Sequence, residues 1–219
     1  MRSTSCRAVL FDLDGTLLDT APDFAVAMNQ LLAKKNRPAL SEAAIRALIS
    51  NGSAGLVAYA FNCTEQDSEF ETIRGEFLEL YLQNLCRQTR PFPGIQALLT
   101  RLGEQGMPWG IVTNKPSRYT TPILAALNLQ PAPGTVICPD HVTNTKPHPE
   151  AVLLACQELA VTPQQTMFVG DHRRDIEAGR SAGVITVAAA YGYIEEDHPD
   201  TWGAHHVVAN ADELRHILF

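Results

Sequence analysis

Two aspartates one residue apart, Asp12 and Asp14, are the first side chains along the chain that could do chemistry, and Gly15 and Thr16 follow them. The stretch before them, Arg7 to Phe11, is predicted to be a buried strand, because a continuous apolar run that ends at a turn signal is typical of parallel sheets. Asp12 would then stand at the carboxyl end of this strand, where open α/β sheets bind their ligands, and Gly15 would let the chain turn sharply. Two carboxylates and a hydroxyl at one sheet edge are suited to bind a metal ion or to transfer protons.

Three more polar clusters follow predicted buried strands later in the chain. They are Thr113-Asn114-Lys115-Pro116, Asn144-Thr145-Lys146-Pro147 and Gly170-Asp171-His172-Arg173-Arg174-Asp175. The first offers a hydroxyl and an amide just before a helix start, where backbone N–H groups attract anions. The second offers a lysine between prolines, which can act as a point charge on a phosphate group. Taken singly, the first is also explained as a capping turn and the second as an exposed loop.

The third cluster could complete a metal site with Asp12. Asp171 follows a strand directly, at a position where helix capping does not explain a carboxylate. Together with Asp12 it would form an oxygen-ligand site of the kind that Mg²⁺ prefers. Asp175 opens the next helix, where the helix dipole alone favours an acid.

The order of the predicted elements indicates an α/β fold, a doubly wound parallel sheet of Rossmann type with an inserted all-helical cap. Strands are expected at 109–113, 135–138, 166–170 and 184–190, with helices between them. From about residue 20 to 88 the apolar spacing is helical, with a break at 51–55 and one long helix expected over 64–87. The core is therefore predicted to comprise 1–18 and 90–219, and the helical cap 19–89.

Charge and composition exclude several classes of protein. The 219 residues carry a formal net charge of −7, which argues against a surface for nucleic acid or anionic membranes. A phosphate-bearing ligand must then be held by a metal or by local cations, and the chain has only four lysines: Lys34, Lys35, Lys115 and Lys146. We predict a cytoplasmic protein without a membrane partner. The five cysteines are scattered, the Met1–Arg7 segment is polar, and the sequence has no run of about 20 apolar residues. The oligomeric state has no signature in the sequence.

In this order and combination, the four clusters carry a family resemblance. Asp-x-Asp-Gly-Thr, Thr-Asn, Lys-Pro and Gly-Asp-x-x-x-Asp resemble the motifs of the haloacid dehalogenase (HAD) superfamily of phosphohydrolases, across essentially the whole chain. The helical insert resembles the mobile cap of that superfamily. The fourth motif departs from the commonest pattern, because His172 and Arg174 stand where serine and asparagine are frequent. His172 is interpreted as an exposed loop residue.

The resemblance implies a phosphatase that works through a covalent intermediate. Asp12 would attack phosphorus to form an aspartyl-phosphate, while Asp14 would protonate the leaving alkoxide and then take a proton from the hydrolytic water. Mg²⁺ would be bound by the Asp12 carboxylate, the Asp14 backbone carbonyl and Asp171, because two aspartates that face a phosphate monoester need charge neutralisation. Asp175 would act behind these ligands or through water, and Thr16 would orient Asp14.

Other residues are expected to hold the substrate, a small phosphorylated metabolite. Thr113, Asn114 and Lys146 would bind the transferring phosphoryl oxygens, and Lys146 would also offset the charge of the acids. Specificity is expected from the cap, where the break at 51–55 could form a loop that leans over the phosphate. The cap residues assigned to this role are Asn51, Gly52 and Ser53. Arg46, nearby in sequence, is expected to be solvated.

Sequence details indicate a branch within the superfamily. The opening Asp14–Thr20 and the helical cap resemble phosphoglycolate phosphatases. The stretches 138–142, 191–194 and 200–204 resemble the N-acetylmuramic acid 6-phosphate phosphatases of bacterial cell-wall recycling, which we favour. The alternatives are a phosphosugar mutase of the same superfamily, whose opening motif commonly lacks the threonine at position 16, a dehalogenase, and a non-enzymatic binding or regulatory module.

Overall fold

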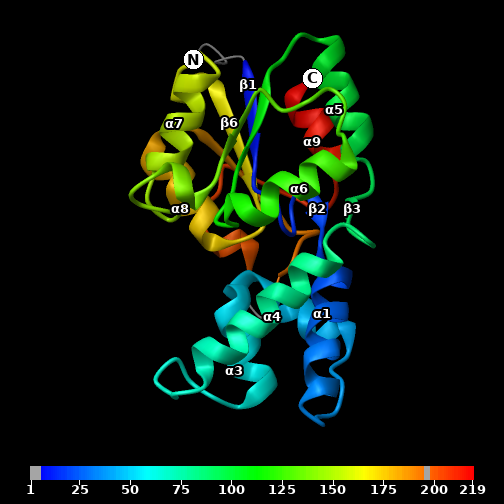
Figure 1. Ribbon diagram of the computed structural model, residues 1–219. Helices are drawn as coiled ribbons and strands as arrows, with labels where there is room; N and C mark the ends of the chain where they lie inside the picture. Colours follow the sequence, from blue (N-terminus) through cyan, green and yellow to red (C-terminus); the bar gives the residue numbers. More distant parts are fainter. Residues whose placement is uncertain (1–5, 195–197) are drawn as a thin grey trace. The chain divides into compact units, whose positions relative to one another are not determined.

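The computed structural model describes residues 6–194 and 198–219, and it divides into two compact units (Figure 1). One unit comprises Met1–Leu18 and Pro91–Phe219, and the other comprises Asp19–Arg90. The chain passes from one to the other in two short strands, β2 (Leu18–Asp19) and β3 (Arg90–Pro91), which pair with each other. Residues 1–5 of the polar N-terminal segment lie outside the described residues.

The first unit is built around a six-stranded parallel sheet. Its strands are β1 (Ala8–Phe11), β4 (Trp109–Val112), β5 (Thr135–Ile137), β6 (Thr166–Gly170), β7 (Ile185–Ala189) and β8 (His206–Val208), in the order β5-β4-β1-β6-β7-β8. The chain runs from β1 outward through β4 to β5 and then returns to the other side of β1 with β6. Such a reversal opens a crevice at the carboxyl ends of the strands, where ligands bind. This topology confirms the predicted doubly wound α/β fold.

Helices cover both faces of this sheet (Figure 1). Helices α7 (Glu150–Glu158) and α8 (Arg173–Ala182) lie on one side, α5 (Ile95–Glu104) and α9 (Ala211–Leu218) lie on the other, and α6 (Ser117–Leu127) follows β4. Leu10 and Phe168 belong to the core beneath α7 and α8. Phe11, the next residue along β1, packs edge-on against Trp109 with 6.1 Å between ring centroids. Because neighbouring strand residues point to opposite faces and both faces are covered, β1 is apolar at every position.

The second unit is made of α1 (Ala21–Lys34), α2 (Glu42–Leu48), α3 (Gly52–Phe61) and α4 (Phe70–Asn84). Helices α1 and α4 pack through aromatic rings, with Phe24 stacked on Tyr81 at a centroid distance of 4.0 Å. Ser41 caps α2 by accepting the backbone N–H of Ala44. Among the helices of the described residues, none combines the length and the apolar character that crossing a bilayer requires.

Three expectations about secondary structure are wrong. The expected loop at 51–55 is instead a 3₁₀ turn, Ile49–Asn51, that runs directly into α3, because Gly52 reverses the chain with a φ of +69°. The helix expected over 64–87 begins only at Phe70, because the carboxylate of Asp67 accepts hydrogen bonds from both the N–H and the hydroxyl of Thr64 and closes a turn there. The edge strand β8 is not among the predicted strands, since two of its three residues are exposed and give a weak apolar signal.

Candidate active site

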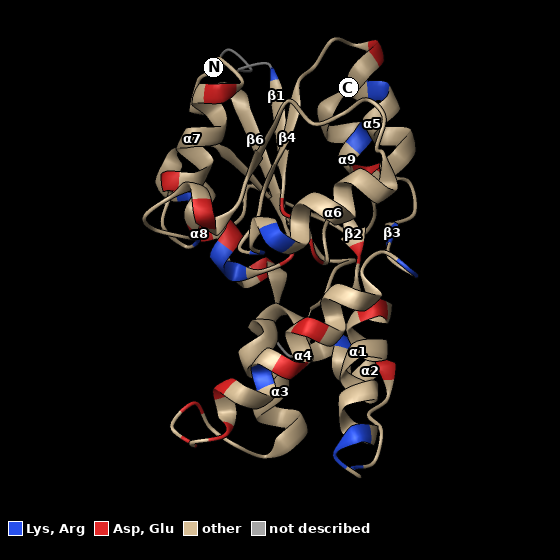
Figure 2. Ribbon diagram, viewed as in Figure 1, with Lys and Arg blue, Asp and Glu red and all other residues tan. Residues whose placement is uncertain are grey.

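Four of the predicted side chains meet at the carboxyl ends of β1 and β6. The backbone N–H of Asp12 donates to Val169 of β6 at 2.9 Å, so the sheet itself fixes the position of this aspartate. Lys146 Nζ lies 2.7 Å from Asp12 Oδ1 and 2.7 Å from Asp175 Oδ1. Carboxylate oxygens of Asp12, Asp171 and Asp175 lie within 4.8 Å of one another. Acidic and basic residues are accordingly gathered in the loops at this end of the sheet (Figure 2).

Burial makes this group of acids unfavourable in the absence of a further cation. Asp171 and Asp175 are 2% and 1% exposed. Desolvation raises the pKa of Asp12 to about 6, with Lys146 opposing the rise and the charges of Asp175 and Asp14 adding to it. Desolvation, together with the charges of Asp12 and Asp175, raises the pKa of Asp171 well above its ordinary value. A divalent cation would relieve this repulsion, and carboxylate oxygens are the ligands that Mg²⁺ prefers, so the donor set fits the predicted metal.

Asp14 has a partner that the sequence analysis does not assign to the site. Lys115 Nζ lies 2.8 Å from Asp14 Oδ1, and the lysine side chain is 5% exposed. The backbone N–H of Lys115 donates to the hydroxyl of Thr113 at 3.1 Å. The signal for this residue is the scarcity of lysine, because two of the four lysines fall inside the strand-end clusters. With both lysines included, four carboxylates face two ammonium groups, a formal balance of −2 that one divalent cation would neutralise.

The carboxylate of Asp171 is fixed by two donors from other parts of the chain. Thr16 Oγ1 donates to Oδ1 at 2.9 Å, and the backbone N–H of Tyr193 donates to Oδ2 at 2.8 Å. The prediction that Thr16 orients Asp14 is therefore corrected, since its buried hydroxyl binds Asp171. The physical reason is the turn at Gly15, whose φ is +86° and which brings the two segments so close that an added Cβ would lie 2.0 Å from Asp171 Oδ2.

The segment 191–193, to which the sequence analysis gives no structural role, closes over the same aspartate. The phenol of Tyr191 donates to the Thr16 carbonyl at 3.0 Å, and burial raises the pKa of this phenol. A Cβ at Gly192 would lie 2.3 Å from Asp171 Cβ and 2.3 Å from the Gly15 carbonyl oxygen. Only a glycine at this position permits so close an approach, and the approach is what brings the neighbouring N–H of Tyr193 to the carboxylate.

Asn114 and Thr113, predicted to bind phosphoryl oxygens, lie beside Lys146. Asn114 Nδ2 donates to the Lys146 carbonyl at 3.0 Å, and Asn114 Oδ1 accepts the Lys146 N–H at 3.2 Å. Asn114 therefore holds the backbone of Lys146, a role that its residue type alone does not predict. Thr113 is buried, and its N–H donates to Ile137 at 3.0 Å, which continues the pairing of β4 with β5 to the edge of the site.

His172 is half-buried and caps α8, which corrects the expectation of an exposed loop residue. Its ring Nδ1 accepts the backbone N–H of Arg174 at 3.1 Å, and its own N–H donates to Asp175 Oδ2 at 3.0 Å. This reciprocal arrangement is a capping box, and it fixes the carboxylate that Lys146 contacts on its other oxygen.

The predicted specificity residues Asn51, Gly52 and Ser53 belong to the second unit, and their contact with a substrate stays a prediction. The hydroxyl of Ser53 accepts Arg74 Nε at 3.0 Å. Arg46 is not merely solvated, because its guanidinium binds both carboxylate oxygens of Asp19, at 3.0 and 2.9 Å.

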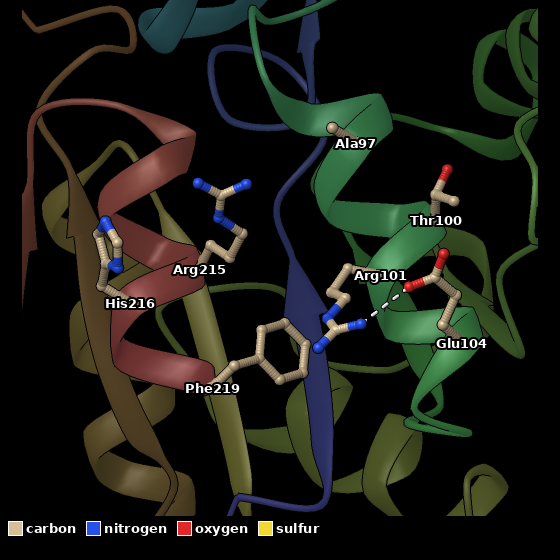
Figure 3. A pocket seen from close by; sticks show the side chains of 7 residues that line it. All are labelled: Ala97, Thr100, Arg101, Glu104, Arg215, His216 and Phe219. Atoms are coloured by element: carbon tan, nitrogen blue, oxygen red, sulfur yellow. Dashed lines mark hydrogen bonds and ion pairs between the residues drawn. The ribbon is translucent and has the colours of Figure 1, made fainter.

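A hollow of about 680 Å³ lies between α5 and α9 (Figure 3). Its arginines are paired with acids, Arg101 with Glu104 at 3.0 Å and Arg215 with Asp212 at 3.5 Å. The hollow is lined by Ala97, Thr100, Arg101, Glu104, Arg215, His216 and Phe219. None of these is a predicted site residue, so within the part of the chain that the structure describes this hollow is separate from the candidate active site.

Comparison with known proteins places this site in a family. The family model described as haloacid dehalogenase-like hydrolase matches residues 9–189. The chain is 46% identical over 213 residues to an N-acetylmuramic acid 6-phosphate phosphatase of Pseudomonas putida, with 97% of this chain and 96% of that protein covered. It is 43% identical over 219 residues to the protein of the same name from Pseudomonas aeruginosa, with 100% and 97% covered.

The chain is also similar to a protein with a second phosphatase name and to a protein of solved structure. The chain is 40% identical over 209 residues to a phosphoglycolate phosphatase of Xanthomonas campestris pv. campestris, with 95% of this chain and 94% of that protein covered. A crystal structure of a predicted phosphoglycolate phosphatase from Haemophilus somnus matches with a TM-score of 0.85 and 30% identity, covering 99% of this chain and 100% of that one. These relatives confirm the predicted class of enzyme, a phosphoric monoester hydrolase. Because the family model spans most of the chain and the relatives share nearly its full length, the chain belongs to the haloacid dehalogenase-like hydrolase family.

Proposed function

We propose that the protein is a Mg²⁺-dependent phosphomonoesterase that hydrolyses N-acetylmuramic acid 6-phosphate through an aspartyl-phosphate on Asp12. The observation that carries the mechanism is the contact of Lys146 Nζ with both Asp12 and Asp175, next to Asp171. This contact unites a nucleophile, a fixed cation and an acidic metal-binding group at the point where the strand order reverses.

In the proposed reaction a carboxylate oxygen of Asp12 attacks phosphorus in line, and the bond between phosphorus and the alcohol oxygen breaks. Asp14 gives its proton to the leaving oxygen, and it later takes a proton from the water that attacks the aspartyl-phosphate. Inorganic phosphate then leaves and the Asp12 carboxylate is restored. Lys146 and the hydroxyl of Thr113 stabilise the negative charge of the phosphoryl oxygens as it is transferred.

In this proposal Mg²⁺ would be held by the carboxylates of Asp12 and Asp171 and by the backbone carbonyl of Asp14, with the Asp175 carboxylate behind these ligands or linked to the ion through water. The ion would neutralise negative charge and so reduce the repulsion between the carboxylate and phosphoryl oxygens. The fixing of Asp171 by Thr16 and by the Tyr193 N–H supports this assignment, because a metal ligand must be oriented by the groups behind it.

The choice of substrate rests on the relatives. Those at 46% and 43% identity support the amino-sugar phosphate, and the relative at 40% identity makes 2-phosphoglycolate the second candidate. The helical unit is the cap in this proposal, with Asn51, Gly52 and Ser53 as specificity residues. A cytoplasmic location remains part of the proposal.

The test is a panel of kcat/KM values for release of inorganic phosphate from N-acetylmuramic acid 6-phosphate, 2-phosphoglycolate and glucose 6-phosphate. We expect the first to exceed the others, EDTA to abolish the activity and Mg²⁺ to restore it. Asp12→Asn should lower kcat by about 10⁴-fold or more, since it removes the nucleophile. Asp212→Asn, an exposed carboxylate at the start of α9, is the matched control and should retain activity.

Three outcomes would contradict parts of this proposal. Equal kcat/KM values across the panel would indicate a generalist and remove both named substrates. An isomerised sugar phosphate in place of free phosphate would indicate a mutase. Activity that persists in EDTA, or in Asp12→Asn, would refute the mechanism itself.

A further inference from the structure

We propose that Lys115 is a positioning residue that, through Oδ1, holds the Asp14 carboxyl group in place while its other oxygen carries the proton that goes to the leaving group. The proposal rests on the proposed function, and its starting observation is the ion pair between Lys115 Nζ and Asp14 Oδ1 at 2.8 Å. The lysine side chain is 5% exposed and that of Asp14 is 20% exposed, so a buried ammonium is paired with a carboxyl group that is partly open to solvent. A buried charge-assisted hydrogen bond has a defined geometry, because an ammonium group that moved away would be left buried and unpaired.

The backbone of Lys115 is itself held on both sides. Its N–H donates to the Thr113 hydroxyl at 3.1 Å, and its carbonyl accepts the buried hydroxyl of Thr120, in α6, at 3.1 Å. Pro116 follows, which restricts the backbone of the residue before it to extended conformations. Lys115 is therefore a fixed point against which the Asp14 side chain is set, rather than a mobile surface lysine.

The two lysines of the site divide the acids between them. Lys146 contacts Asp12 and Asp175, whereas Lys115 contacts Asp14. Both lysines come from loops at the carboxyl ends of neighbouring parallel strands. Lys115 follows β4, the neighbour of β1, and Lys146 follows β5, the neighbour of β4. The group that must meet the leaving oxygen thus has its own anchor, separate from the anchor of the nucleophile.

A fixed carboxylate matters most where proton transfer is difficult. An alkoxide leaving group needs the proton, whereas p-nitrophenolate leaves without it, so a misplaced Asp14 should slow alkyl phosphates selectively. The value of kcat/KM is the measure of choice, because it reports on phosphoryl transfer to Asp12 and is unaffected by the later hydrolysis step, which all substrates share.

The experiment compares the wild type, Lys115→Met and Asp14→Asn in the full-length protein with Mg²⁺, on p-nitrophenyl phosphate and on an alkyl phosphate, the proposed substrate N-acetylmuramic acid 6-phosphate. General acid catalysis contributes roughly 10²–10⁴-fold, so we expect Lys115→Met to lose at least about tenfold more kcat/KM on the alkyl ester than on the aryl ester. Adding Lys115→Met to Asp14→Asn should change neither value further, because both substitutions remove the same function. Lys35→Met is the matched control, since it breaks an exposed 2.8 Å pair with Glu76, and it should leave both values unchanged.

Other results would overturn the inference. An equal loss on both esters, or independent losses in the double variant, would mean that Lys115 does not act through Asp14. If Lys115→Met does not fold, Lys115→Gln decides, because it also removes the charge and must show the same selective loss on the alkyl ester. A wild type that hydrolyses neither ester would remove the proposed function and this inference with it, whereas an active wild type with an unchanged ratio in Lys115→Met would remove the inference alone.

Discussion

Replacing Asp171 tests whether the buried group of acids binds Mg²⁺. Its carboxylate repels those of Asp12 and Asp175 in a buried site, and its pKa lies well above the ordinary value. An acid with a raised pKa in the folded state destabilises the fold at pH values above its unfolded pKa, so losing this charge should relieve the repulsion. At pH 7.5 in EDTA, Asp171→Asn should therefore unfold at or above the Tm of the wild type.

The addition of Mg²⁺ should reverse that order. At a hundredfold excess over Kd, the ion should raise the wild-type Tm by roughly 5–10 °C and leave Asp171→Asn unchanged. Asp14→Asn is the matched control, because the proposed ligand from that residue is its backbone carbonyl, and it should keep most of the rise. A full rise in Tm for Asp171→Asn would show that the acid cluster is not the Mg²⁺ site. Differential scanning fluorimetry measures all three proteins.

At the scale of residues, the sequence predicts groups that stand at strand ends and misses the groups that hold them. Asp12 and Asp171 each follow a buried strand directly, and Lys146 lies in the longer loop after β5, so their meeting at one edge of the sheet could be expected. The pair of Lys115 with Asp14 joins residues 101 positions apart, and nothing local in either motif specifies it. The donor to Asp171 from Tyr193 is a backbone N–H, which has no signature in residue type.

The start of helix α6 depends on another element. Pro116, its capping residue, provides no side-chain hydrogen bond, and the carboxylate of Asp140 accepts the Ser117 N–H at 2.6 Å instead. Hydrogen bonds from the Ser117 side chain and backbone hold the pKa of Asp140 below its usual range. Since Asp140 lies in the turn Pro139–His141 that follows β5, it links the end of that strand to the helix behind the Thr113–Lys115 loop.

Asp140→Asn should therefore lower the Tm at pH 7, because the neutral amide accepts the same hydrogen bonds more weakly. An acid whose pKa is depressed by folding contributes stability above its unfolded pKa and loses it as pH falls through the folded pKa. The Tm difference from the wild type should be constant between pH 7 and 5 and should shrink below pH 4. Thermal unfolding across this series is the measurement, with Glu65→Gln, an exposed acid of the helical unit, as control. A difference that is independent of pH would assign the effect to packing.

At the scale of elements, the pattern of apolar residues predicts a strand or helix correctly where the element is buried along its whole length. Strands β1, β4 and β6 are buried along their whole length, so a continuous apolar run identified each of them. The turn that delays α4 depends on a hydrogen bond between Thr64 and Asp67, which competes with helix formation and leaves the apolar spacing intact. Strand β8 is short and lies at the sheet edge, where exposed positions remove the pattern.

For the whole molecule, the change from alternating strands and helices to helices alone indicated an inserted segment. The order of the strands was beyond such reasoning, because it is set by which faces pack together rather than by the pattern of any single strand. The residues that close the inserted unit on itself were also beyond it. They join the first turn of α1 to the segment just before β3, across 65 and 66 positions of the chain.

Asp23 makes this closure, and its replacement should loosen the helical unit selectively. Its buried carboxylate accepts the N–H of Gln88 at 2.8 Å and both the N–H and the hydroxyl of Thr89, at 3.1 and 2.6 Å. Asp23→Ala would leave these donors unsatisfied, at a cost of about 3 kcal/mol or more to that unit. Hydrogen–deuterium exchange in α1 and α4 should then rise by roughly a hundredfold, while exchange in β1 and β6 stays unchanged, because those strands belong to the other unit. Glu71→Ala, which removes an exposed acid of the same unit, should leave both regions unaffected. Equal acceleration in both units would mean that they unfold together and that Asp23 stabilises the molecule as one cooperative structure.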